Sequence, residues 1–494
     1  MRKTLLLALL VIAFLAMPAM ASVQNVKVGG QINTMWMVRD QFDLGTVTRS
    51  DDFYQNFIMT HVRLRVDADL TDNVQATVAL LNERAWDEDL NDIDGGVSQN
   101  EGANDVDLNL AYVTLREMLY SPLTVIVGRQ LFAYGNSFVI DAAGTNNVLS
   151  TGGLKGVSED MTSFRTAQDA IRLILDYNPL TIDLVASKID ANRLAGTGAQ
   201  DDDVDLFGSN ANYKIGDQWD SVVEGYFWAK IDQSTKVNSA GQTGHYKADT
   251  VYVPGIRVSS NPIKGLNVSV EGALQRGNIT QTETASAAAE NQKREAAGAQ
   301  VITNYVLPFE KTAKWSPVFT GVYTYVSGDN DNNDIRRDAI PLYPVDRTYE
   351  GWDPMFENQG GGSIYNTLFD LTNVHIYIAK AQLKPIEDVT AWAVWTGMWI
   401  DKEIAGARDA FVGDCTGTTA AGCFSMRQPD GTTITPRVTT NKSVGNEFGI
   451  GMLYDYTEDV QIGARADWFR PGGLFHDDNE DVASQYVVNA NVNF

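Results

Sequence analysis

The stretch A-S-Q-Y-V-V-N-A-N-V-N-F, residues 483–494, decides the fold. Apolar residues occupy every second position from Tyr486 to Phe494, and asparagines fill the positions between them near the end. Side chains of a strand point alternately to its two faces, so this strand has one apolar face and one hydrated face. A soluble sandwich can use such a strand as well, so the rest of the chain must decide between the two settings.

The beginning of the chain favours export. Arg2 and Lys3 precede an apolar run at 5–15, and Ala19-Met20-Ala21 is a small-x-small cleavage site, so residues 1–21 read as a signal peptide. No later apolar run has the length of a spanning helix, and a membrane form of this chain must therefore cross with strands. The terminal Phe494 resembles the aromatic residue by which the barrel-assembly machinery recognises outer-membrane barrels.

The alternation of the closing strand recurs along the whole of 22–494, which we interpret as one domain. In the segment 58–68, for example, the even positions are mostly apolar, whereas the odd positions carry His61, Arg63, Arg65 and Asp67. The connections are long after odd-numbered segments and short after even-numbered ones. This sorting is typical of an all-β, antiparallel transmembrane β-barrel with short periplasmic turns and long extracellular loops. We predict about 18 strands, with 16 as the alternative, and both termini in the periplasm of a bacterial cell.

Charge and motifs exclude several functions. The chain has 38 basic and 63 acidic residues, which argues against nucleic acid as a partner. It contains no G-x-S-x-G, H-E-x-x-H or Walker motif, so we expect no enzyme and no cofactor. The two cysteines, Cys415 and Cys423, predict a local loop disulfide in an oxidising compartment, with a metal pair or free thiols as the alternatives.

Charged residues on the hydrated faces are the candidates for lumen selectivity. Two interpretations stay open: the arginines form a ladder that binds anions, or they pair with acidic neighbours in a passive hydrated wall. The candidates are Arg63, Arg65, Arg129, Arg172, Arg257, Glu447, Arg465 and Asp467.

The acidic stretch at 329–334 is a weak calcium candidate through Asp329, Asp331 and Asp334. It lacks the glycine and the glutamate of an EF-hand loop, so only irregular calcium binding in an external loop is expected, and no other metal site. Such carboxylates are also able to bridge divalent cations to lipopolysaccharide.

Several segments together resemble the alginate-export family of outer-membrane channels. They include Gly128-Arg129-Gln130 with Tyr134-Gly135, Arg165-Thr166 with Asp169-Ala170 and Arg172, Ser327-Gly328-Asp329 with Pro341-Leu342-Tyr343-Pro344 and Gly351-Trp352, and Gly445-Asn446-Glu447 with Phe469-Arg470-Pro471-Gly472. The resemblance implies an 18-stranded barrel, a monomer rather than a trimer, and an arginine-rich lumen that passes an anionic polysaccharide. The Asp and Arg that follow Tyr-Gly in the family are Asn136 and Phe138 here, which weakens the case for alginate itself.

These observations lead to one expectation and one alternative. We expect a porin-like channel in the outer membrane, surrounded by lipid and lipopolysaccharide, that passes hydrophilic and anionic solutes or polysaccharide. The loops at 145–167, 327–371 and 401–442 are candidates for a lid or plug. The alternative is a structural barrel that anchors or sheathes a surface partner, such as a surface layer or a multihaem cytochrome.

Overall fold

The structure is a computed structural model, and it describes most of the chain except for the N-terminal segment and several connections. The described residues are 25–45, 54–86, 106–119, 122–141, 167–190, 203–233, 248–281, 290–308, 314–329, 348–358, 361–404, 426–427, 433–434, 436, 438–476 and 479–494. The predicted signal peptide, Cys415 and Cys423 lie outside these residues.

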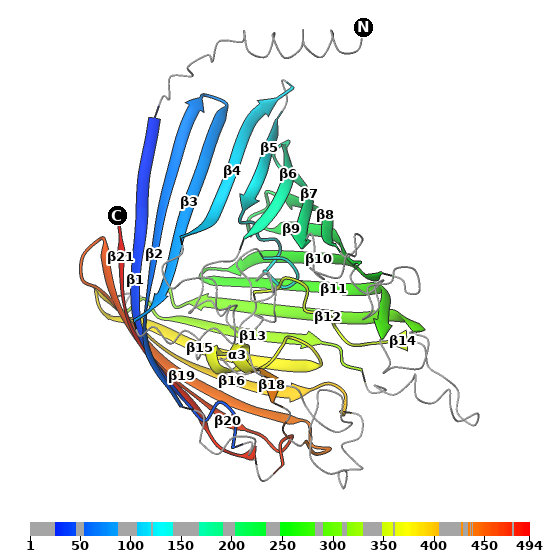
Figure 1. The fold of residues 1–494 in the computed structure, drawn as a ribbon, viewed down its shortest axis with the longest axis vertical. Helices are drawn as coiled ribbons and strands as arrows, with labels where there is room; N and C mark the ends of the chain where they lie inside the picture. Colours follow the sequence, from blue (N-terminus) through cyan, green and yellow to red (C-terminus); the bar gives the residue numbers. More distant parts are fainter. Residues whose placement is uncertain are drawn as a thin grey trace.

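Eighteen antiparallel strands form the wall of a closed barrel, which confirms the predicted fold and the higher of the two strand numbers (Figure 1). The strand β14 (Thr348–Tyr349) adds to β12 in parallel, β17 (Met426–Arg427) and β18 (Thr433–Ile434) form a small separate ribbon, and α3 (Ser363–Leu368) is a short helix. The wall strands are β1 (Asn25–Asp40), β2 (Tyr54–Thr71), β3 (Val74–Ala85), β4 (Asp107–Met118), β5 (Leu123–Gln130), β6 (Gln168–Asp176), β7 (Leu180–Asp190), β8 (Val204–Lys214), β9 (Val222–Asp232), β10 (Asp249–Ile263), β11 (Leu266–Gln281), β12 (Glu290–Val306), β13 (Val318–Val326), β15 (Val374–Ile386), β16 (Val389–Ile400), β19 (Ser443–Asp455), β20 (Val460–Pro471) and β21 (Ala483–Asn493).

The barrel closes where its first and last strands pair. The register of β1 with β21 runs from Gln31 opposite Asn493 to Asp40 opposite Ser484. The terminal residue extends this pairing, because Gly30 N–H donates to the Phe494 carbonyl at 2.8 Å and Phe494 N–H donates back at 3.0 Å. The C-terminus accordingly lies beside β1 in Figure 1. Closure leaves no open edge along the paired length, which a strand in hydrocarbon requires.

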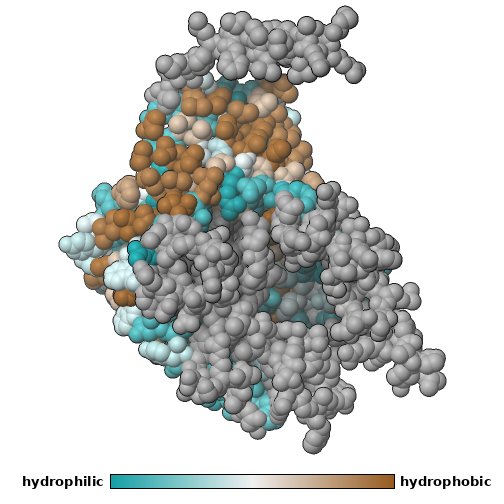
Figure 2. Space-filling view, in the orientation of Figure 1, coloured by the Kyte–Doolittle hydropathy of each residue, from teal (hydrophilic) through white to brown (hydrophobic). Residues whose placement is uncertain are grey.

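The outer face of the wall is apolar. Val28, Val66 and Val78 lie opposite one another on three neighbouring strands, and each side chain is exposed or partly exposed. Figure 2 shows apolar residues gathered over the upper part of the view, where β1 to β5 lie. None of the described helices has the length and apolarity needed to span a membrane. The predicted alternation is therefore the alternation between lipid and lumen.

Two strands extend beyond local sequence features that often end a strand. β15 continues past Pro385 to Ile386, with a register shift between Leu383 and Ile386. β12 begins at Glu290, because polar residues of the β11–β12 hairpin keep pairing beyond the apolar band.

Gly30 is required for the seam to close tightly. A Cβ at this position would lie 2.8 Å from the Arg63 carbonyl oxygen and 2.5 Å from Cζ of Phe494. We predict that Gly30→Val destabilises the folded barrel by about 1–3 kcal/mol through this overlap. The loss is measured as a lower temperature for the folded-to-unfolded mobility shift on gels.

Gly225→Val serves as the matched control, since a Cβ on Gly225 of β9 meets nothing within 4 Å. If Gly30→Val and Gly225→Val lower the unfolding temperature equally, the seam is no more sensitive to an added side chain than the rest of the wall.

Candidate functional site

The inner wall differs between its two halves. Near the short turns the lumen-facing residues are polar, among them Gln31, Asn33, Arg65, Asn489 and Asn491. Near the long connections, in what we call the outer half, many of the lumen-facing residues are apolar and buried. They are Val204, Leu206, Trp228, Val251, Val253, Val326, Val374, Ile376, Met398, Ile400, Phe469 and Ala483.

Two chain segments fill the outer half and bury this apolar wall. The first insert is 131–141, which follows β5, and the second insert comprises 348–358 and 361–372, which precede β15. Their apolar side chains belong to the same core as the inner wall, with Tyr134 against Trp228 at 4.9 Å between ring centroids and Phe369 against Phe469 at 5.7 Å. The second insert lies within the predicted plug loop 327–371 except for its last residue, Thr372. The first insert precedes the predicted loop 145–167, of which the structure describes only Ala167.

The two inserts also bind each other. Phe356 N–H donates to the Val139 carbonyl at 3.1 Å, Asp141 N–H donates to the Phe356 carbonyl at 2.6 Å, and Phe138 stacks on Trp352 at 5.4 Å. The backbone of each insert therefore finds partners in the other, and the pair forms one constriction.

Wall carboxylates hold the first insert by its backbone. Glu224 accepts from Gly135 N–H at 2.9 Å, and Glu271 accepts from Asn136 N–H at 2.6 Å. Arg257 Nε donates to the Asn136 side-chain oxygen at 2.6 Å and pairs with Glu224 at 3.2 Å. Both carboxylates are buried, at 4% and 1% exposure, so they anchor the insert instead of lining an open pore.

The second insert is anchored at two places. Asp353 accepts from Lys230 Nζ at 2.6 and 2.7 Å and lies 3.9 Å from Arg294. At the start of α3, Glu447 accepts from Ile364 N–H at 3.2 Å and from Tyr365 N–H at 2.9 Å. Free N–H groups at a helix start favour a carboxylate, so Glu447 satisfies two of them at once.

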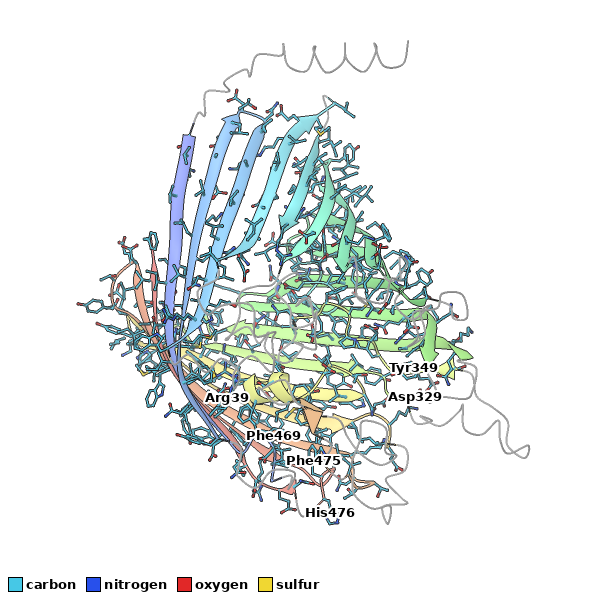
Figure 3. The ribbon with its side chains drawn as sticks, viewed as in Figure 1. Arg39, Asp329, Tyr349, Phe469, Phe475 and His476 are labelled. Atoms are coloured by element: carbon cyan, nitrogen blue, oxygen red, sulfur yellow. The ribbon has the colours of Figure 1, made fainter. Side chains whose placement is uncertain are left out.

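The side chains labelled in Figure 3 lie in two groups. Tyr349 lies beside Asp329, and the guanidinium of Arg294 lies 5.3 Å from the centre of the Tyr349 ring. Arg39 and Phe469 are well separated from them in the view. There, Arg39 Nε donates to Gln485 at 2.8 Å, and Gln485 donates to Ser363 of α3 at 2.7 Å.

Most of the predicted lumen charges do face inward, but in local pairs. Arg65 pairs with Asp67 at 2.8 Å, Arg172 with Asp183 at 2.7 Å, and Arg465 with Asp467 at 2.7 Å. Together with Arg257 and Glu224, these pairs match the passive-wall interpretation for four of the arginines.

Arg63 and Arg129 depart from this pattern in different ways. Arg63 lies inside, with Arg65 and Tyr112 as its charged or polar neighbours, and no described carboxylate pairs with it. Arg129 shares the parity of outward-facing Val127 and Ile171, and it pairs with Asp169 at 3.1 Å on the outside of the wall. The prediction that Arg129 faces the lumen is therefore wrong, because Gly128 and Gln130 occupy the inward positions of β5.

The metal candidates stay predictions. Asp331 and Asp334 lie outside the described residues, whereas Asp329 is described. Within the described part of the chain, no group of three or more His, Cys, Asp or Glu side chains is arranged to hold a metal ion.

Sequence reasoning missed the first insert and the anchor formed by Lys230, Arg294 and Asp353. A signal for the inserts exists in the wall: Tyr226, Phe227, Trp228 and Ala229 are consecutive apolar residues, which indicates burial on both faces of β9. Nothing local in the sequence shows that Asp353 meets a lysine 123 positions earlier.

The charge of Asp353 makes its anchor sensitive to acid. Burial alone would raise the pKa of this carboxyl, but Lys230, Arg294 and the hydrogen bonds outweigh burial and leave the pKa below its ordinary value. Because the pKa of Asp353 is lower in the folded protein than in the unfolded chain, its charge stabilises the fold at pH values above the unfolded pKa of about 3.9. This stabilisation is lost as the pH falls through the pKa of the folded state. We predict that Asp353→Asn lowers the thermal midpoint by a constant amount from about pH 7 to 5, and by less below about pH 4.

Thermal unfolding of both proteins across this range tests the prediction. Glu350→Gln, which changes an exposed carboxylate in the same insert, should follow the wild type. If the difference in thermal midpoint between Asp353→Asn and the wild type already decreases between about pH 7 and 5, the lowered pKa assigned to Asp353 is contradicted.

Glu447 yields a second prediction, on the position of α3. Glu447→Ala leaves two buried N–H groups without their acceptor, at a cost of about 1–3 kcal/mol each. We expect the helix to leave the wall more often, so that chymotrypsin cleaves after Tyr365 or Phe369 in the folded variant. Glu458→Ala, an exposed turn substitution, should stay as resistant as the wild type. Resistance of Glu447→Ala would count against the anchor.

Comparisons with known proteins agree with the barrel fold. Solved structures of similar fold include OccK8 (OprE) of Pseudomonas aeruginosa, with a TM-score of 0.52, 9% identity and coverage of 96% of this chain and 98% of that chain. OpdO of the same species matches with a TM-score of 0.52 and 9% identity over 96% and 98% of the two chains, and OccK11 (OpdR) with 0.50 and 10% over 96% of each. At such identities the likeness establishes the fold alone.

The sequence itself supplies the family. No curated protein matches the chain at a significant level. The model of the alginate-export family matches residues 24–489, which is nearly the whole chain. This match, together with the closed 18-stranded barrel, places the chain in the alginate-export family of porin-like outer-membrane channels.

Proposed function

We propose that the channel passes hydrophilic, anionic solutes and that Arg63 is the main source of its anion preference. The observation that carries the proposal is the position of Arg63, which is half-buried on the lumen side of β2 without an ion pair to any described carboxylate. A partly desolvated cation in a pore wall raises the local concentration of anions and repels cations.

A second lumen cation supports the proposal. Lys380 on β15 shares the inward parity of Ile376 and Ile378, and its neighbours are Arg465 and the ring of Trp392, 5.8 Å away. It too has no ion pair to a described carboxylate. Arg65, Arg172, Arg257 and Arg465 each pair with a carboxylate, whereas Arg63 and Lys380 do not, so the charges of these two remain available to attract a mobile anion.

We also propose that both termini and the short turns face the periplasm. The end of the barrel with the short turns carries the first residue of β1 and the C-terminal Phe494. The long connections and both inserts then belong to the external side, as in barrels of this class. In this orientation the constriction guards the outer mouth, and the cationic wall lies between it and the periplasm.

Ion selectivity in planar bilayers tests the proposal. Wild-type channels are expected to prefer anions, and Arg63→Ser with Arg65→Ser should roughly halve the anion-to-cation permeability ratio, because the lumen loses the unpaired charge of Arg63 and the Asp67 carboxylate loses its partner. Arg129→Ser is the matched control, since it removes an arginine from the outer face. Cation preference in the wild type would overturn the proposal, and a wild-type barrel that does not conduct would favour the structural alternative.

A further inference from the structure

We propose that Lys230 and Arg294 form an anion-binding site on the inner wall, which Asp353 occupies in the closed channel and which a carboxylate-bearing solute takes over when the second insert leaves. Asp353 is then a built-in competitor of the cargo. The inference rests on the proposed passage of anions, and it adds the means by which such an anion opens the constriction.

The wall presents the two cations in a shallow cradle. Lys230, Val251, Gly277 and Arg294 lie opposite one another on the consecutive strands β9 to β12. Gly277 has a φ of +145° and no room for a Cβ, which would lie 2.0 Å from the Thr250 carbonyl oxygen. The middle of the row therefore carries no bulky polar group, and a carboxylate is able to lie between the lysine and the arginine.

The insert occupies this cradle as a ligand would. Both oxygens of Asp353 accept from Lys230, and Arg294 lies 3.9 Å away. Gln275, on β11, holds the peptide of Asp353 from both sides: it accepts from Asp353 N–H at 2.8 Å and donates to the Asp353 carbonyl at 2.6 Å. Arg294 also donates to the Gly351 carbonyl at 3.3 Å.

The charges explain why departure of the insert creates a site. Asp353 is the one described carboxylate that pairs with Lys230 or Arg294. Without it, these two wall cations, on β9 and β12, have no described counter-ion, which favours binding of another anion. Lys230 lies two positions from the end of β9 and Arg294 four positions from the start of β12, at the mouth with the long connections. A solute that crosses the outer half therefore meets this site.

Single-channel recordings of the full-length barrel test the inference, with glutarate as the carboxylate probe. Asp353→Asn should raise the conductance several-fold and should be blocked by glutarate at lower concentration than the wild type. The triple variant Asp353→Asn, Lys230→Met, Arg294→Gln should keep the raised conductance and lose the sensitivity to glutarate. Glu350→Gln should behave as the wild type, and the mobility shift on gels confirms that each variant is folded.

Two results would overturn the inference. In the first, Asp353→Asn has the same conductance and the same response to glutarate as the wild type. In the second, glutarate blocks the triple variant and Asp353→Asn equally. Its failure is distinguishable from failure of the proposed function. Anion preference of the wild type, and its loss with Arg63 and Arg65, are measured without these variants.

Discussion

The requirement that every peptide group in hydrocarbon finds a hydrogen-bond partner governs the rest of the structure. It makes closure between β1 and β21 obligatory, and the exchange of hydrogen bonds between Gly30 and Phe494 extends that closure to the last residue. Closure in turn sets the parity of every strand, so that one set of side chains faces lipid and the other faces the lumen. The missing side chain of Gly30 follows from the same demand, because the seam leaves no space for one.

The same rule applies inside the barrel, where the inserts are buried against the outer half of the wall. The inserts carry peptide groups that are not in strands, and wall side chains satisfy them: Glu224, Glu271 and Glu447 accept from backbone N–H groups, and Gln275 binds both sides of one residue. Burial of these carboxylates is tolerated because each meets donors. The acidic residues of the wall thus hold the constriction.

The sequence allowed the barrel, its strand number and the inward direction of most charges to be predicted, because a period of two is a local signal that each strand repeats. It failed at Arg129, where the alternation of Leu123 to Gln130 is blurred by Gly128. It also missed the roles of Glu447 and Arg257, which looked like members of a selective wall. Their partners are Ile364, Tyr365 and Asn136, residues of inserts that are far away in the chain, and no periodicity connects them. The apolar inner face of strands such as β9 was the one available sign that something covers the lumen there.

Hydrogen exchange of the wild-type barrel in detergent tests the central claim most directly, which is that wall-anchored inserts fill the outer half of the lumen. The account predicts that amides in 131–141 and 361–371 exchange as slowly as those of the neighbouring strands, because they are hydrogen-bonded and buried. Exchange of these amides at the rate of an open, solvated loop would contradict it.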